Sequence, residues 1–201
     1  MFDAILRRRI NPPLDFTAQM LGRMGLAADH VTLVGFAFGC AAAVAIATGY
    51  LSAALGFIAA NRLADGLDGA VARASAATDR GGFLDISLDF VFYASVPLAF
   101  AVLDPARNAL PAAILLSCFL ANGAAFFAFA LMAERRGITS QAQGLKSLYY
   151  VAGLAEGAET IAAFALFCLF PAAFPWLAAA FAALCALSAI ARIVLGWRLL
   201  S

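Results

Sequence analysis

Residues 65 to 90 read DGLDGAVARASAATDRGGFLDISLDF and contain four aspartates, at positions 65, 68, 85 and 89. The chain around this stretch is rich in Ala, Leu, Phe and Val. Of its 201 residues 65% are hydrophobic and 12% are charged, and the mean hydropathy is +0.93. Such a composition lies far outside the range of soluble globular domains. We therefore predict an all-α integral membrane protein in which the acidic stretch carries the function.

Apolar stretches of the length that a membrane-spanning helix needs, about 20 residues, recur along the chain. We predict one membrane-embedded domain over residues 1–201, with six transmembrane helices and no separate soluble domain. A tight turn at Gly49 and Tyr50 separates the first two spans. An amphipathic helix at residues 10–27, opened by two prolines, is predicted to lie on the membrane surface before them. The six predicted spans are residues 31–50, 51–73, 82–103, 109–133, 148–170 and 176–200.

Lysine and arginine in short loops favour the cytoplasmic side of a membrane. Six spans and a cytoplasmic N-terminus put nearly all of these cations inside and only Arg107 outside, so both termini are predicted to be cytoplasmic. The net charge of +1 offers no argument for nucleic-acid binding. The N-terminal arginines are not followed by an apolar core and a cleavage site, which argues against a signal peptide. The cytoplasmic cations are Arg7, Arg8, Arg9, Arg23, Arg73, Arg80, Arg135, Arg136, Lys146 and Arg198.

The aspartates fall at helical spacing on either side of a predicted cytoplasmic turn. Asp65 and Asp68 are three residues apart and share one face of the second span. Asp85 and Asp89 are four apart and share a face of the third span. Because the turn makes these two spans antiparallel neighbours, we predict that the four carboxylates converge near the cytoplasmic membrane surface.

Carboxylates crowded at low dielectric repel one another unless cations lie between them. One metal ion, or more readily two, meets this requirement. Carboxylate oxygens are hard ligands and His30 is the single histidine, so Mg²⁺, Mn²⁺ or Ca²⁺ suits the stretch better than zinc. The four cysteines lie in apolar runs without zinc-site spacing and are interpreted as packed, reduced thiols. Hard cations of this kind usually act on phosphates, which favours a phosphoryl-transfer site.

Small residues keep the same helix face thin. Gly66, Gly69, Ala70 and Ala72 leave room for a bulky ligand or another backbone. Arg73 ends the span, where its guanidinium suits either a phosphate contact or an anchor at the cytoplasmic surface.

This pattern resembles the signature of the CDP-alcohol phosphatidyltransferases, integral membrane enzymes of phospholipid synthesis. In that family D-x-x-D-G-x-x-A-R is followed by G-x-x-x-D-x-x-x-D. The gap between the two halves is seven residues here, from Ala74 to Arg80, against the family's usual eight. The segment ADHVTLVGF, with Asp29 to Thr32, also looks like the family's entry into its first span. The matching positions are Asp65, Asp68, Gly69, Ala72, Arg73, Gly81, Asp85 and Asp89.

The resemblance implies a six-helix core, usually dimeric, with a polar cavity that faces the cytoplasm. It implies transfer of a phosphatidyl group from CDP-diacylglycerol to a small polar alcohol, with release of CMP, in the inner membrane. Asp65, Asp68 and Asp85 would then be metal ligands for Mg²⁺ or Mn²⁺, and Asp89 would be both a ligand and the general base. The implied CDP-binding residues are Thr32, Asp68, Gly69, Ala72, Arg73 and Gly81.

The motif does not specify the acceptor alcohol. Arg135, Arg136 and Lys146 suit either an acceptor phosphate or ordinary positive-inside charge. Glu156 and Glu159, three apart in the fifth span, suit either acceptor binding or an ion pair with an intramembrane arginine, Arg62 or Arg192. Glycerol 3-phosphate, glycerol, an inositol phosphate and serine all stay open, and the basic residues tilt the choice towards a phosphorylated polyol.

Two other functions are compatible with intramembrane acids. A cation or proton transporter would use them along its pathway, although the aspartates cluster in one half of the membrane instead of crossing its full depth. An inactive membrane scaffold would retain the bundle without binding metal, although every carboxylate of the signature is present.

Overall fold

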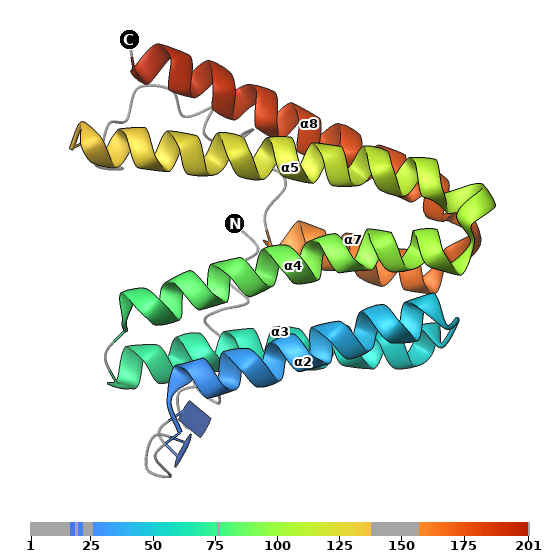
Figure 1. The fold of residues 1–201 in the computed structure, drawn as a ribbon, viewed down its shortest axis with the longest axis horizontal. Helices are drawn as coiled ribbons and strands as arrows, with labels where there is room; N and C mark the ends of the chain where they lie inside the picture. The colour runs from blue at the N-terminus through green and yellow to red at the C-terminus, as the bar shows by residue number, and fades with distance from the viewer. Residues whose placement is uncertain (1–16, 19, 22–25, 76, 138–156, 201) are drawn as a thin grey trace. The chain divides into compact units, whose positions relative to one another are not determined.

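The computed structural model describes residues 17–18, 20–21, 26–75, 77–137 and 157–200. The regular structure in these residues is helical, which confirms the predicted all-α class (Figure 1). Most of the predicted surface helix at 10–27 and the start of the fifth span lie outside the described residues. The elements are α2 (Ala28–Ala47), α3 (Leu51–Ser75), α4 (Asp79–Leu103), α5 (Pro105–Arg135), α7 (Gly157–Leu169), the short 3-10 helix η1 (Pro171–Ala173) and α8 (Phe174–Leu199).

Four segments of the described chain are long and apolar enough to cross a membrane: α2, α4, α5 and the run from η1 through α8. Helix α3 has 25 residues, enough to cross a bilayer at about 1.5 Å per residue. It carries Arg62, Asp65, Asp68 and Arg73, however, so its composition is less apolar. The described part of α7 has 13 residues. The helices follow the predicted spans in order, and the charged residues that lower the hydropathy of α3 are those that the sequence singles out for function.

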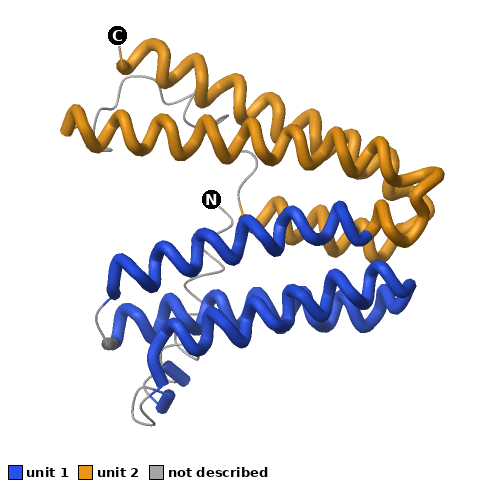
Figure 2. Tube along the Cα trace, viewed as in Figure 1, with its two compact units in different colours: residues 1–99 blue, residues 100–201 orange. Residues whose placement is uncertain are grey.

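Contacts divide the chain into two compact units, Met1–Ala99 and Phe100–Ser201 (Figure 2). In the first unit α2 packs along α3. The predicted tight turn between them is confirmed at Gly49, whose φ of 84° lies in the left-handed region that favours glycine. The N–H groups of Gly49 and Tyr50 donate to the carbonyls of Ile46 and Ala45, at 2.9 and 2.8 Å. These two bonds form a Schellman motif, which satisfies the last carbonyls of α2.

Two glycines on α2 allow the neighbouring helices to approach closely. A Cβ at Gly35 would lie 2.9 Å from the Cβ of Ala64 on α3, and a Cβ at Gly39 would lie 2.8 Å from Cδ2 of Phe92 on α4. Phe92 is fully buried. The absence of a side chain at these two positions therefore brings α2 close to the helices that carry the aspartates.

We expect Gly39→Ala to destabilise the protein by about 1–3 kcal/mol, because the new methyl group overpacks against the buried Phe92 ring. In a protein of this size that corresponds to a fall of about 2–4 °C in the unfolding midpoint per kcal/mol. The measurement is thermal unfolding in one detergent. Gly56→Ala is the matched control, because nothing lies within 4 Å of its Cβ, and its midpoint should stay level or rise. An unchanged midpoint for Gly39→Ala would show that this contact is loose.

In the second unit α5 packs along α8, and α7 contacts α8 and η1. Aromatic rings fill its core: Phe100 stacks on Phe174 with ring centroids 4.5 Å apart, and Phe167 meets both rings edge-on. The Asp104 side chain caps α5 by accepting from the Arg107 N–H at 3.2 Å. The aromatic contacts stabilise this unit by close packing of apolar rings.

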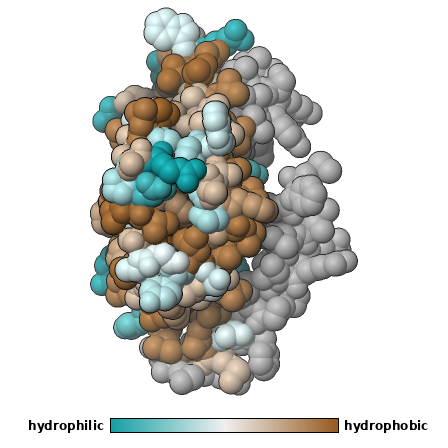
Figure 3. All heavy atoms as spheres, turned by 90° about the vertical axis from the view of Figure 1, so that its right-hand side faces the viewer, coloured by the Kyte–Doolittle hydropathy of each residue, from teal (hydrophilic) through white to brown (hydrophobic). Residues whose placement is uncertain are grey.

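Many large apolar side chains point outward from the described helices. Leu63, Phe83, Leu120, Trp176 and Trp197 are all more than 60% exposed. The face in Figure 3 likewise shows broad apolar areas between small hydrophilic patches. An outward apolar surface of this extent is what a lipid environment requires and what water disfavours.

Candidate active site

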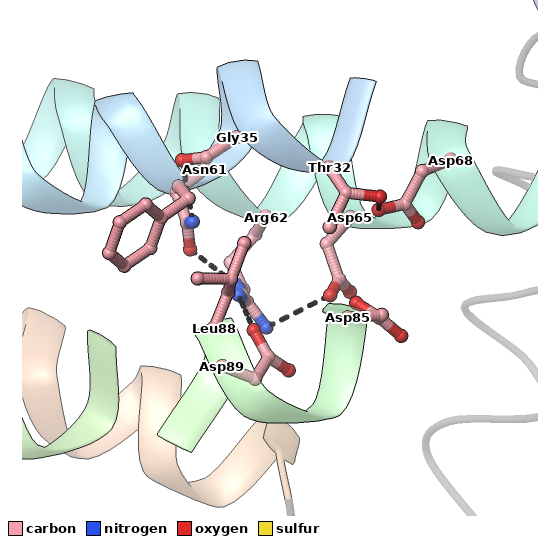
Figure 4. Close-up of a pocket in the computed structure, with 10 residues that line it drawn as sticks. Thr32, Gly35, Asn61, Arg62, Asp65, Asp68, Asp85, Leu88 and Asp89 are labelled. Atoms are coloured by element: carbon pink, nitrogen blue, oxygen red, sulfur yellow. Dashed lines mark hydrogen bonds and ion pairs between the residues drawn. The ribbon is translucent and has the colours of Figure 1, made fainter. Parts of the chain in front are cut away.

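One pocket of the first unit is lined by polar residues from α2, α3 and α4 (Figure 4). The helical spacing of Asp65 and Asp68 points both towards it from α3, and Asp85 and Asp89 reach it from one face of α4. Helix α2 contributes the Thr32 hydroxyl group and the backbone of Gly35, which packs closely against α3. The lining residues are Thr32, Gly35, Phe36, Asn61, Arg62, Asp65, Asp68, Asp85, Leu88 and Asp89.

Three of the four aspartates converge. Carboxylate oxygens of Asp65, Asp85 and Asp89 all lie within 4.8 Å of one another, and each residue is partly buried. Asp65 comes from α3 and the other two from α4, so the cluster depends on how these helices face each other. The predicted meeting of the second and third spans at a common acidic site is found for these three residues.

The fourth aspartate lines the same pocket but has a different partner. Asp68 is 6% exposed, and its Oδ2 accepts a 2.7 Å hydrogen bond from the Thr32 hydroxyl group on α2. The Thr32 oxygen also lies 3.1 Å from the Ala28 carbonyl. The structure therefore places Asp68 beside the cluster of three, and it explains why Thr32 belongs to the site.

We expect Thr32→Val to lower the unfolding midpoint, because valine keeps the shape and leaves a buried carboxylate oxygen without its donor. A hydrogen bond to a charged group contributes about 1.5–3 kcal/mol. Thermal unfolding of Thr32→Val and of Thr32→Ser, which keeps the hydroxyl group, is the measurement. Equal midpoints for the two variants would show that the bond adds nothing to stability.

Arg62 is the cation of the pocket. Its Nη2 lies 2.7 Å from Oδ1 of Asp89, and its Nη1 lies 3.5 Å from Oδ1 of Asp65. Its Nε donates to Oδ1 of Asn61 at 2.8 Å, and Asn61 in turn donates to the Gly35 carbonyl at 2.9 Å. The sequence left Arg62 and Arg192 open as ion-pair partners for the glutamates of the fifth span. In the structure Arg62 pairs with aspartates.

Tyr93, one turn after Asp89, completes the surroundings of that carboxylate. Its hydroxyl group donates to Oδ2 of Asp89 at 3.2 Å and accepts from Nη1 of Arg62 at 3.2 Å. Sequence reasoning missed this residue. The signal was present, since positions four apart on a helix are neighbours, but Tyr93 lies in an aromatic run typical of membrane helices.

The sequence model of the CDP-alcohol phosphatidyltransferases matches residues 25–196, well over half of the chain. The chain belongs to this family. The resemblance inferred from the eight motif residues is thus confirmed, and the protein is a phosphatidyltransferase-family enzyme with a membrane-embedded helical fold.

Relatives support the same assignment. The chain is 48% identical over 197 residues to the inner membrane protein YnjF of Escherichia coli, with 98% of this chain and 96% of that protein covered. It is 43% identical over 89 residues to an archaetidylinositol phosphate synthase of Methanothermobacter thermautotrophicus, with 44% and 42% covered. A crystal structure of the Mycobacterium tuberculosis phosphatidylinositol phosphate synthase, with CDP-DAG bound, is similar in fold. Its TM-score is 0.68 at 21% identity, with 94% of each chain covered.

The donor set of the pocket fits the metal dependence expected for a phosphatidyltransferase. Two oxygens that bind one Mg²⁺ at about 2.1 Å lie about 2.9–4.2 Å apart, so the 4.8 Å bound on the three carboxylates is close to what one ion requires. The donors are hard oxygens, as Mg²⁺ and Mn²⁺ prefer. His30 has a structural contact instead: its Nδ1 accepts from the Ala27 N–H at the start of α2, at 3.2 Å.

The remaining motif positions of this phosphatidyltransferase lie at the ends of α3 and α4. A Cβ on Gly69 would lie 3.4 Å from Nη1 of Arg73, so position 69 lies directly beside the guanidinium. Arg73 is exposed at the end of α3. Gly81, in the first turn of α4, donates its N–H to the Thr78 hydroxyl group at 3.1 Å, and a Cβ there would lie 3.1 Å from Oδ1 of Asp29.

Arg80, beside Gly81, pairs with the same Asp29 carboxylate. This ion pair joins the start of α2 to the start of α4. A glycine at position 81 is therefore explained by the short distance between the start of α4 and the Asp29 carboxylate.

The candidate acceptor residues belong to the second unit, whereas the pocket is lined by the first. Arg135 ends α5 and Arg136 follows it, and both are exposed. Glu159 is exposed in the first turn of α7. Arg192 on α8 lies over the Phe126 ring, 4.9 Å from its centroid. Lys146 and Glu156 lie outside the described residues.

Proposed function

We propose that the protein transfers a phosphatidyl group from CDP-diacylglycerol to a small phosphorylated polyol and releases CMP. The observation that carries the proposal is the convergence of Asp65, Asp85 and Asp89, which the family motif supplies from two helices. The CDP-DAG bound to the mycobacterial synthase of similar fold supports the choice of donor.

Each motif residue has a proposed role in this reaction. Two Mg²⁺ or Mn²⁺ ions would be held by Asp65, Asp85 and Asp89, with Asp68 beside them. When bound, these ions neutralise the pyrophosphate and the departing CMP. Asp89 takes the proton of the acceptor hydroxyl group, whose oxygen attacks the phosphorus nearest the lipid while the bond from that phosphorus to CMP breaks.

The CDP moiety is assigned to residues around the ends of α3 and α4. Thr32 orients Asp68, which faces the nucleotide as well as the metal. Arg73 offers a guanidinium to a phosphate, and the small residues Gly69, Ala72 and Gly81 leave space for the nucleotide to approach.

The finer membrane organisation is also part of the proposal. We propose one domain over residues 1–201 with six spans, because α3 and the fifth span complete the four clearly apolar helices. Both termini and the pocket then face the cytoplasm, in an inner membrane as the name of YnjF suggests. We also expect a homodimer, as the family resemblance implies.

A phosphorylated polyol is the favoured acceptor. Two similar proteins are named archaetidylinositol phosphate synthase and phosphatidylinositol phosphate synthase, and exposed Arg135 and Arg136 suit an anionic acceptor. Glycerol 3-phosphate and an inositol phosphate are therefore the first two candidates, with Lys146, Glu156 and Glu159 as further candidate contacts.

The test is CMP release by the purified protein from CDP-diacylglycerol with Mg²⁺ or Mn²⁺. The panel contains glycerol 3-phosphate, inositol phosphate, glycerol and serine, and a sample without acceptor. We expect metal-dependent release that one phosphorylated polyol stimulates. Stimulation by serine or glycerol alone would overturn the acceptor class. No release from folded, metal-binding protein would overturn the donor and favour cation transport by the acid cluster.

A further inference from the structure

The Asp89 carboxylate is held on both of its oxygens by side chains of this chain. Arg62 contacts Oδ1 at 2.7 Å, Tyr93 donates to Oδ2 at 3.2 Å, and Arg62 also donates to the Tyr93 oxygen at 3.2 Å. The three side chains form a closed ring of polar contacts. Rotation of the carboxylate would break two of them. Because each carboxylate oxygen accepts about two hydrogen bonds, Asp89 keeps acceptor capacity for another group in this fixed orientation.

Arg62 is itself held from several sides. Asn61, which is 4% exposed, accepts from its Nε and donates to the backbone of α2 at Gly35. The Arg62 Cζ lies 5.4 and 5.6 Å from the ring centroids of Phe92 and Tyr93. Only 18% of its side chain is exposed. The planar fork of an arginine serves these partners together, which the point charge of a lysine does not.

The same guanidinium contacts two members of the acid cluster, Asp89 and Asp65. A cation bound by the cluster would therefore lie within a few ångströms of a fixed positive charge. At the low effective dielectric of a largely buried site, this repulsion is strong. In a protein without metal, the same charge offsets the mutual repulsion of the carboxylates.

We propose that Arg62 is a positioning residue and a built-in counter-ion: with Tyr93 it orients Asp89, and its charge weakens metal binding by the cluster of Asp65, Asp85 and Asp89. The effect on turnover rests on the proposed function, whereas the effect on metal affinity does not. If Arg62 formed only a structural ion pair, its removal would weaken metal binding and also slow turnover. The proposal requires opposite signs, with tighter metal binding and slower turnover.

The experiment compares Arg62→Gln, Arg62→Lys and Tyr93→Phe with the full-length protein in one detergent. Calorimetry with Mn²⁺ and no substrate gives metal affinity, and CMP release gives kcat and KM. For Arg62→Gln we expect Mn²⁺ binding at least about tenfold tighter, kcat lower by about a hundredfold, and a donor KM changed by less than about threefold. Arg107→Gln, an exposed arginine outside the cluster, is the control and should match the wild type in both assays.

The other two variants separate charge from orientation. Arg62→Lys keeps the charge, so its Mn²⁺ affinity should stay within about threefold of the wild type, while kcat is only partly restored because lysine lacks the fork. Tyr93→Phe should keep the metal affinity and lower kcat by about tenfold, since one bond to Asp89 is lost.

Weaker Mn²⁺ binding by folded Arg62→Gln would overturn the counter-ion role. Unchanged kcat in Tyr93→Phe and Arg62→Lys would overturn the positioning role, and these two variants decide it even if Arg62→Gln does not fold. Absence of CMP release from the wild type with every acceptor would be a failure of the proposed function instead, and the Mn²⁺ comparison would still test the counter-ion.

Discussion

Asp89→Asn is expected to lower CMP release by about a thousandfold. The amide keeps the shape of the carboxylate but cannot take the proton of the acceptor alcohol, and general-base catalysis contributes about 10²–10⁴ in rate. One negative charge is lost from the acidic cluster as well. The measurement is kcat for CMP release at saturating metal, donor and acceptor.

The control for Asp89→Asn is the same change at Asp79, which is exposed in the first turn of the same helix and lies outside the pocket. Asp79→Asn should retain the wild-type rate. Full activity of an Asp89→Asn protein that still binds Mn²⁺ would show that another group is the base.

Asp85→Asn is expected to weaken Mn²⁺ binding by at least about a hundredfold and to abolish CMP release at metal concentrations that saturate the wild type. Hard divalent ions depend on the charge of their carboxylate ligands, and Asp85 is one of the three residues whose oxygens converge. This variant leaves the contacts of Arg62 with Asp65 and Asp89 in place. It therefore tests metal binding separately from the positioning of Asp89.

Calorimetry with Mn²⁺ and a CMP-release assay over a range of metal concentrations measure the effect of Asp85→Asn. Asp79→Asn again serves as the comparison. An Asp85→Asn protein with wild-type Mn²⁺ affinity would remove Asp85 from the ligand set and leave the convergence of the carboxylates without a metal-binding role.

Much of the helical framework was predictable because it depends on local properties of the chain. Apolar length predicted helices close to the observed ones, and Gly49 marked the turn between α2 and α3. The charged residues of α3 interrupt the hydropathy pattern, so this helix is the one for which composition is least informative and function most so.

The contents of the pocket were less predictable. The spacing of the aspartates indicated a shared site, but the partner of Asp68 is Thr32 on another helix, 36 positions away in sequence. The sequence equally allowed Arg62 to pair with glutamates of the fifth span, whereas it contacts Asp65 and Asp89. Tyr93 was hidden among the aromatic residues of a membrane helix.

The amino-acid sequence was enough to predict the membrane class, the helical faces of the acids and, through eight motif positions, the family. These follow from composition and from the 3.6-residue period, which are properties of single segments. Which carboxylates converge, and the position of Arg62 beside them, depend instead on the packing of the helices against one another. That choice depends on how closely α2, α3 and α4 approach, which is governed by contacts such as Gly39 with Phe92 between residues far apart in the chain.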